Sequence, residues 1–168
     1  MRRTLKVPMR YVPKYLSIKD KREQSKMLLK SRKLYKKGTY YTRKKLKTFK
    51  SKTSDHITRA KTLYNVDKII PSKELATKTG CSISALKQIV KKGEGAYYSS
   101  GSRPNQTAQS WGYARLASAI TGGKSAAVDY NILEKGCKHN KKAFILAKKS
   151  QKKYNFGKRK AKTTIIKI

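Results

Sequence analysis

The side chains that could carry out catalysis or hold a metal ion are few and scattered along this chain. Both histidines, His56 and His139, lie among cations, and neither has a carboxylate at a spacing that would orient it as a general base. Cys137 and His139, with the distant Cys81, match no regular spacing of zinc ligands. Eight Asp and Glu residues are too few to assemble the paired carboxylates of two-metal or glycosidic chemistry. We therefore expect no catalytic residue, no metal site and no cofactor in a protein that is not an enzyme.

One short segment is similar to a phosphate-binding loop. Thr121 to Ser125 contains the Gly-Lys-Ser of a P-loop, but Ser118 stands where that motif needs its first glycine. The segment is expected to be the end of a helix followed by a turn.

The chemistry that the sequence does favour is electrostatic. The chain has 44 Lys and Arg residues against eight Asp and Glu, a formal net charge of +36 at pH 7. Such an excess destabilises a compact state by self-repulsion, and it predicts a polyanionic partner. Nucleic acid is favoured because neutralised phosphates release counterions. Charge alone equally allows acidic protein surfaces or anionic membrane headgroups, although no apolar run approaches the roughly 20 residues that span a membrane.

The positive charge is concentrated in the two flanks of the chain. Between Glu94 and Glu134 the cations and acids balance, whereas the stretch up to Lys52 is dense in Lys and Arg. Aromatic residues interleave with these cations, an arrangement that suits stacking on bases. It suits docking into a protein groove equally well. The candidate partner-binding residues are Lys19, Arg22, Lys26, Lys30, Arg32, Lys33, Tyr40, Tyr41, Arg43, Lys44 and Lys45.

Most of these residues are expected on one helix that runs to about Lys37. Ser17 and Asp20 have the spacing of a capping box, and Gly38 can end the helix in a left-handed conformation. Met27, Leu28, Leu34 and Tyr35 are expected on its apolar face. Further helices are predicted at residues 55–65, 108–121, 128–135 and 140–153.

Residues 73–92 have the pattern of a helix-turn-helix. Gly80 suits the turn, and Gly93 is expected to end the second helix. The outward face of that helix would carry Ser84, Lys87, Gln88 and Lys91, which are acceptable in a DNA major groove. Helix pairs with a glycine turn are also common structural devices, and the sequence does not separate the two readings.

The neutral centre supplies a second set of candidates. Arg103, Asn105 and Gln106 lie in a polar loop that could grip an anion or satisfy neighbouring helix ends. Trp111 is expected to anchor the core or to serve as a surface anchor. Cys81 and Cys137 are the only cysteines, and they are expected to be reduced, partly buried thiols.

These observations predict a mainly α fold: a small helical domain with a helix-turn-helix-like pair and extended basic N- and C-terminal arms. The expected division is 1–53 for the basic arm and Lys-rich helix, 54–137 for the compact domain, and 138–168 for a basic helix and tail. The tail is expected to be disordered or to add an edge strand to a partner.

Several stretches of the sequence resemble a known protein family. They are Tyr11–Leu16, Arg32–Gly38, Lys92–Gly112 and Ala114–Ser118. They are similar to small basic proteins of unassigned function encoded by nucleocytoplasmic large DNA viruses, the giant viruses of algae and protists. The resemblance covers most of residues 11–137 and implies a viral source.

A viral source implies one of two functions. The first is a minor capsid or cement protein in the virion, beneath the outer shell and intracellular during assembly, whose basic arms link the major and minor capsid proteins by multivalent docking. The alternative is a DNA-binding protein that condenses or regulates the viral genome.

Overall fold

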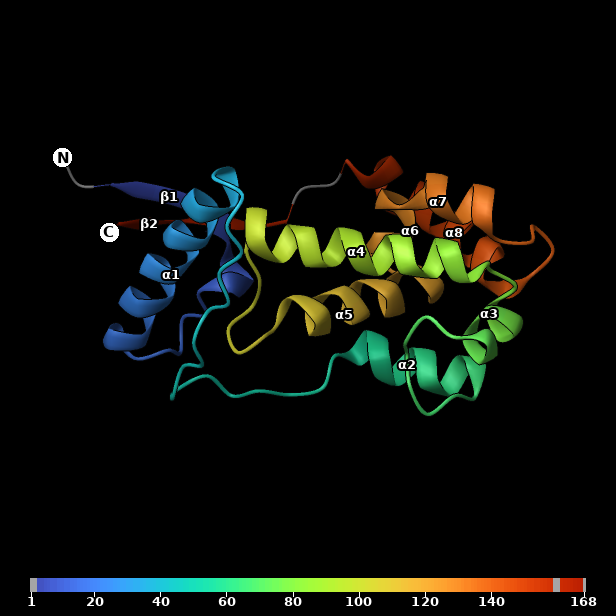
Figure 1. Cartoon of the computed structure of the whole chain (residues 1–168), viewed down its shortest axis with the longest axis horizontal. Coiled ribbons are helices and arrows are strands. Elements are labelled where there is room, and N and C mark those ends of the chain that lie inside the picture. Colours follow the sequence, from blue (N-terminus) through green and yellow to red (C-terminus); the bar gives the residue numbers. More distant parts are fainter. Residues whose placement is uncertain (1–2, 159–160, 168) are drawn as a thin grey trace. The chain divides into compact units, whose positions relative to one another are not determined.

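The computed structural model describes residues 3–158 and 161–167 of the chain. Within these residues the fold is mainly α, as the sequence predicts, with one two-stranded sheet (Figure 1). The helices are α1 (Ile18–Lys36), α2 (Asp55–Tyr64), α3 (Lys73–Thr79), α4 (Ile83–Ser99), α5 (Ala108–Ile120), α6 (Lys124–Val128), α7 (Tyr130–Gly136) and α8 (Lys142–Lys153). The strands are β1 (Thr4–Pro8) and β2 (Thr163–Lys167), and short 3-10 turns occupy Met9–Tyr11 and Asn155–Gly157.

The chain forms two compact units. Unit 1 contains residues 1–52, 94–108 and 160–168, and unit 2 contains residues 53–93 and 109–159. Their first boundary lies close to the division predicted after residue 53. The predicted compact domain, 54–137, differs from unit 2 at two places: residues 94–108 belong to unit 1, and unit 2 includes α8, whose Ala143, Phe144 and Ala147 are buried in the same core as residues of α4 and α5.

In unit 1 the two ends of the chain pair with each other. β1 and β2 are antiparallel, with Thr4 opposite Lys167 and Pro8 opposite Thr163. The peptide N–H of Met9 also donates to the carbonyl of Lys162, at 3.0 Å. The expectation of a disordered tail is therefore wrong for residues 161–167. The β-branched residues of the tail find their strand partner within this chain.

The predicted N-cap and glycine end of α1 are confirmed, but the capping box is only half made, because the Ser17 N–H donates to the Thr48 hydroxyl instead of the Asp20 carboxylate. The Ser17 hydroxyl accepts from the Asp20 N–H at 3.1 Å, and Gly38 adopts a left-handed conformation with φ of +77° after the helix ends. Met27 and Leu28 are buried as predicted. Leu34 is partly buried, whereas Tyr35, expected on the same apolar face, is exposed, with its ring centre 6.2 Å from that of Tyr40.

The core of unit 2 is built from the apolar faces of its helices. Leu75 of α3, Leu86 and Ile89 of α4, Leu116 and Ile120 of α5 and Leu133 of α7 are all fully buried. Each such side chain stabilises the fold by about 1.5–3 kcal/mol. The Tyr64 hydroxyl of α2 donates to the Ile120 carbonyl, and burial raises the pKa of Tyr64. α2 is thereby fixed against the C-terminal end of α5.

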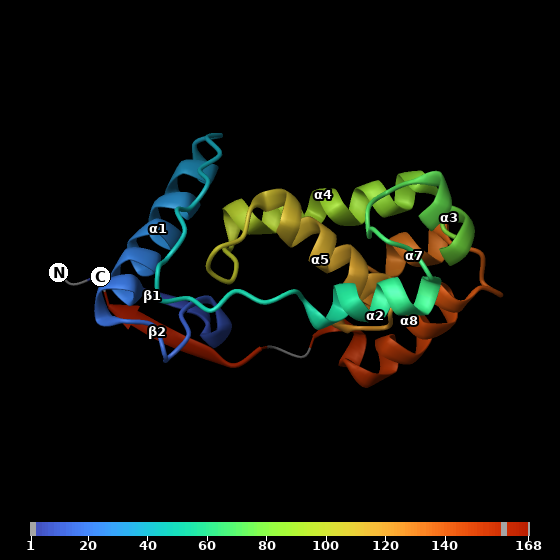
Figure 2. The ribbon, with the colours of Figure 1, turned by 90° about the horizontal axis from the view of Figure 1, so that it is seen from below.

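The predicted end of the second helix at Gly93 is wrong, since α4 continues through Gly93 and Gly95 to Ser99. Gly93 serves close packing. A Cβ at this position would lie 2.5 Å from the Cα of Gly112, so no larger residue fits where α4 and α5 approach each other. These two helices run side by side in both views (Figure 1, Figure 2).

One other predicted helix also differs from the structure. The helix expected over residues 128–135 is split into α6 and α7 around Asp129, and Gly123 precedes α6 in an extended conformation. The Thr121–Ser125 segment is the end of α5 and a turn, as expected, with Gly122 at φ of +73°.

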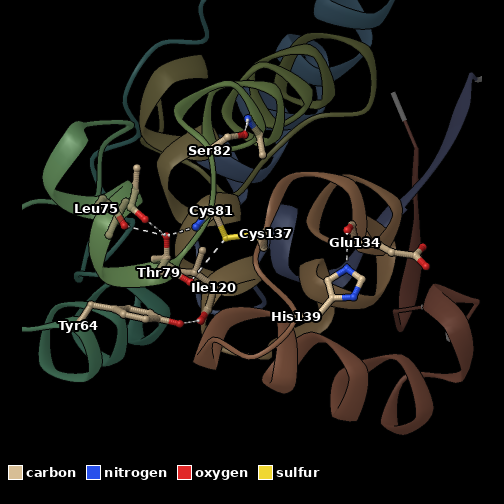
Figure 3. Close-up of a disulfide and its surroundings, with 11 residues drawn as sticks. Tyr64, Leu75, Thr79, Cys81, Ser82, Ile120, Glu134, Cys137 and His139 are labelled. Atoms are coloured by element: carbon tan, nitrogen blue, oxygen red, sulfur yellow. Dashed lines mark hydrogen bonds between the residues drawn. A yellow bond between two sulfur atoms is a disulfide. The ribbon is translucent and has the colours of Figure 1, made fainter.

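The two cysteines form a disulfide, so the expectation of reduced thiols is wrong (Figure 3). Backbone hydrogen bonds hold the same segments together: the Ser82 N–H donates to the Gly136 carbonyl, and the Lys138 N–H donates to the Gly80 carbonyl, both at 2.8 Å. This local antiparallel pairing sets Cys81 opposite Cys137, although 56 positions separate them.

Candidate polyanion-binding surface

α1 and its C-cap residue, Lys37, carry a stripe of six exposed cations. At 3.6 residues per turn, their spacing of three or four residues places them within about 80° of the helix circumference. They span about 27 Å at a rise of ~1.5 Å per residue. The members of this cationic stripe are Lys19, Arg22, Lys26, Lys30, Lys33 and Lys37, and all six are exposed.

The opposite side of α1 fixes the orientation of the stripe. Met27, Leu28 and Ser31 are buried there, and the Ser31 hydroxyl donates to the Tyr98 carbonyl at 3.1 Å. The Gln24 side-chain amide donates to the Tyr11 carbonyl at 3.1 Å. Because one side of the helix is held by packing and hydrogen bonds, the stripe is held toward solvent.

Holding these cations on one face carries an energetic cost. Like charges three or four residues apart destabilise a helix by about 0.2–0.5 kcal/mol per pair, and each neighbouring pair in the stripe has this spacing. An anion bound along the stripe would remove the repulsion. The surface is also hollowed: an open depression of about 350 Å³ is lined by Lys26, Leu29, Lys30, Lys33, Leu34 and Lys37.

A second basic depression lies at the N-terminal half of α1, beside β2. Its volume is about 240 Å³, and its cations come from three separate segments of unit 1. It is lined by Val12, Lys14, Lys21, Arg22, Ser25, Thr164, Ile166 and Lys167. The paired end of the chain thus adds Lys167 to the basic surface of α1.

Arg43, a predicted binding residue, has a different role. It is only 7% exposed, and its guanidinium donates to the Ser31 hydroxyl at 3.0 Å, the Tyr97 carbonyl at 2.8 Å and the Ser102 hydroxyl at 2.8 Å. Its Cζ lies 3.8 Å from the centre of the Tyr97 ring. Burial lowers the pKa of Arg43, with Tyr97 acting in the opposite direction. This side chain holds the 39–53 segment against α4 residues of unit 1.

Arg32 is also committed to the fold. Its Nε and Nη2 donate to the Ser100 carbonyl at 2.9 and 2.7 Å. Burial is the main cause of its lowered pKa, and Tyr11 opposes that shift. The sequence cannot separate Arg32 from the stripe residues by type, but its position on the helix points it away from them.

The remaining candidate residues of the 39–53 segment differ in how far their side chains are exposed. Tyr40 is exposed, whereas Tyr41 packs against the cluster of Leu16, Met27 and Leu46. The Lys30 ammonium lies 4.5 Å from the centre of the Tyr41 ring. Lys44 and Lys45 are exposed.

The Thr48 backbone and side chain anchor this segment to the start of α1. The Thr48 N–H and hydroxyl both donate to the Asp20 carboxylate, at 2.8 and 2.5 Å. These hydrogen bonds lower the pKa of Asp20.

The polar loop of the neutral centre braces its neighbours. Asn105, at φ of +60°, accepts from the Leu46 N–H at 2.6 Å and donates to the Leu46 carbonyl at 3.2 Å. Arg103 is exposed and Gln106 is partly buried. Trp111 is partly buried on α5. Trp111 belongs to unit 2, whereas the polar loop and the stripe residues belong to unit 1.

The outward face predicted for α4 exists, since Ser84, Lys87, Gln88 and Lys91 are all exposed. The opposite, buried face of this helix packs on α7: a Cβ on Gly136 would lie 2.3 Å from the Ala85 Cβ. In a DNA-reading helix-turn-helix the first residues of the second helix contact base edges.

Sequence reasoning missed three residues of this surface. Lys37 continues the three-or-four spacing of the stripe, and that periodicity could have identified it. Tyr35 and Tyr98 lie close to Tyr40, with Tyr40 and Tyr98 ring centres 5.0 Å apart. No local pattern indicates a contact between residues 40 and 98.

Two searches of the described residues gave negative findings. No three His, Cys, Asp or Glu side chains within residues 3–158 and 161–167 are grouped so that they could hold a metal ion. In the same residues, no helix has the length and apolar character needed to cross a membrane.

Comparison with known proteins gives one match. Neither the curated proteins nor the solved structures contain a match to this chain. The model of a family of unknown function, DUF5824, matches residues 8–134, which is more than half of the chain and includes α1 through most of α7. This chain therefore belongs to the family of unknown function DUF5824.

Proposed function

We propose that this protein is a non-enzymatic nucleic-acid-binding protein that holds phosphates along the cationic stripe of α1. The observation that carries the proposal is the set of six exposed cations on one face of a helix whose other face is buried. Phosphates along a strand of DNA repeat about every 3.4 Å, so a stripe of about 27 Å spans several of them. Contacts of this kind fix position and do not read sequence.

The stripe supports this proposal better than the helix-turn-helix pair supports sequence reading. The outward face predicted for α4 has two cations, Lys87 and Lys91, whereas the stripe has six. The capsid or cement role stays a prediction, as does the viral source. The basic N- and C-terminal arms predicted to link capsid proteins include β1 and β2, which pair with each other.

The proposal is tested by the salt dependence of duplex DNA binding. Each phosphate contact contributes about 0.9 to the slope of log K against log salt concentration. The triple variant Lys26→Gln, Lys30→Gln, Lys33→Gln is expected to reduce that slope by about 3 and to weaken binding at low salt. Fluorescence anisotropy of a labelled duplex at several salt concentrations measures both quantities.

A matched control removes the same charge from exposed positions of unit 2. The variant Lys142→Gln, Lys149→Gln, Lys152→Gln on α8 is expected to retain most of the affinity and slope. Equal losses in both triple variants would show that binding follows net charge and would overturn the stripe as the site. Stronger binding of an acidic protein than of duplex DNA at equal ionic strength would favour the capsid prediction instead.

A further inference from the structure

Three tyrosine rings meet at the C-terminal end of α1. The centre of the Tyr40 ring lies 5.0 Å from that of Tyr98 and 6.2 Å from that of Tyr35, with interplanar angles of 36° and 41°. Tyr40 is 68% exposed and Tyr35 is 38% exposed. These three residues, which we call the tyrosine platform, come from α1, from the segment after it and from α4, all within unit 1.

Buried groups next to the platform hold its residues in place. Tyr97 is fully buried, and its ring meets that of Tyr98 edge-on at 5.1 Å. The Tyr97 hydroxyl accepts from the Arg43 N–H at 2.9 Å, and the Arg43 guanidinium covers the Tyr97 ring. These contacts fix the chain on both sides of the platform. The rings are therefore positioned before any ligand arrives.

The exposure of Tyr40 is not explained by packing. Its neighbour Tyr41 is the residue that packs against the cluster of Leu16, Met27 and Leu46. Tyr40 instead presents most of its ring to solvent, where an aromatic side chain gains little for the stability of the fold.

The platform and the cationic stripe both reach the C-terminal end of α1. Lys33 and Lys37 are the last two cations of the stripe, and Tyr40 follows the left-handed turn at Gly38. Tyr35 lies between the two lysines in sequence but projects from the other side of the helix. A helix with its side chains is about 10–12 Å across. A flexible strand that follows the stripe to the end of α1 can therefore pass over this end and place its next bases at the tyrosines.

We propose that the tyrosine platform stacks unpaired bases, so that the ligand class is single-stranded nucleic acid. This inference rests on the proposed function, in which the stripe holds the phosphates. A cationic groove combined with aromatic side chains is the arrangement by which proteins bind single strands without reading sequence. The phosphates of a duplex can reach the stripe. Its bases, however, are already stacked on one another within the double helix, so none has a free face for Tyr40.

The test compares single strands and a duplex on variants of Tyr40. Tyr40→Leu keeps an apolar side chain but removes the aromatic face, and it is expected to weaken binding of labelled oligo(dT) and oligo(rU) about tenfold. Its affinity for a duplex of the same length is expected to stay unchanged. Tyr40→Phe keeps the ring and should bind all three ligands as the wild type does. Comparing oligo(dT) with oligo(rU) shows whether the single strand is preferred as DNA or as RNA.

A matched control removes an exposed aromatic residue elsewhere. Phe156, in unit 2, is 60% exposed, and Phe156→Leu should change none of the affinities. Thermal melting followed by circular dichroism checks that each variant is folded.

The outcomes separate this inference from the proposed function. If the stripe variant weakens binding but Tyr40→Leu binds oligo(dT) as the wild type does, the platform is refuted and the stripe stands. If the stripe variant has wild-type affinity for every ligand, the proposed function fails. An equal loss of affinity for duplex and single strand in Tyr40→Leu would also refute base stacking, because the bases of a duplex are paired and cannot stack on Tyr40.

Discussion

At the scale of single residues, the surroundings of a basic side chain decide what it contributes. Arg43 and Lys30 both belong to the basic part of unit 1. Arg43 is buried, and its guanidinium donates hydrogen bonds to two hydroxyls and a carbonyl, whereas Lys30 is exposed on α1. A buried guanidinium with neutral acceptors stabilises the fold only while those hydrogen bonds are made. The exposed ammonium remains available to a ligand.

We predict that Arg43→Ala lowers the free energy of unfolding by about 3 kcal/mol, because Ser31, Ser102 and the Tyr97 carbonyl would lose their buried donor. Arg43→Lys should lower it by about 1–2 kcal/mol, since an ammonium cannot reproduce the planar fork. Urea denaturation measures both values. The affinity of folded Arg43→Lys for duplex DNA should match the wild type, because Arg43 is not a member of the stripe. A variant of normal stability with weakened duplex binding would contradict a structural role.

At the scale of elements, α4 shows that the same residue type, glycine, can have opposite effects on stability at two positions of one helix. Gly93 lies against Gly112, where a Cβ would come within 2.5 Å of the Gly112 Cα. Gly95 has no atom within 4 Å of the position that its Cβ would occupy. The first glycine permits the close approach of α4 and α5, and the second only weakens the helix.

We predict opposite effects of alanine at these two glycines. Gly93→Ala should destabilise the protein by about 1–3 kcal/mol, because α4 and α5 would have to move apart. Gly95→Ala should leave stability unchanged or raise it by up to about 1 kcal/mol, since alanine favours a helix. Thermal denaturation of both variants makes the comparison, and a similar loss in each would show that Gly93 has no special packing role.

The elements were predictable from sequence where their signals are local. Ser17 and Asp20 predict the start of α1, and Gly38 predicts its end, because capping involves residues a few positions apart. Gly93 was misinterpreted because a glycine that ends a helix and one that permits packing have the same local sequence. Only the position of Gly112, on another helix, distinguishes the two.

At the scale of the whole molecule, contacts between distant parts of the sequence join segments that no local pattern relates. The disulfide links positions 56 residues apart, and β1 pairs with β2 across nearly the whole chain. Two cysteines far apart in the sequence do not by themselves predict a disulfide. A tail rich in β-branched residues predicts a strand but does not indicate which segment pairs with it. The cationic stripe was predictable because it lies on one helix, whereas the tyrosine platform was not because Tyr98 comes from α4.

We predict that the disulfide makes a large contribution to stability. Closing a loop of this length reduces the entropy of the unfolded chain, which corresponds to roughly 4 kcal/mol. The double variant Cys81→Ser, Cys137→Ser should therefore unfold at a lower urea concentration than the oxidised wild type. A reducing agent should shift the wild type in the same direction and leave the variant unaffected. Equal stability of the wild type with and without reductant would contradict this prediction.

The pairing of β1 with β2 also sets an order of events during synthesis. A ribosome makes the chain from its N-terminus, so β1 emerges first, and both segments of unit 2 are synthesised before residues 163–167. Until β2 has emerged, β1 therefore has an unpaired strand edge, which is open to pairing with other chains. The sheet of unit 1 must close after translation has passed β2, and until then the nascent protein depends on its own positive charge, or on a chaperone, to keep that edge from aggregating.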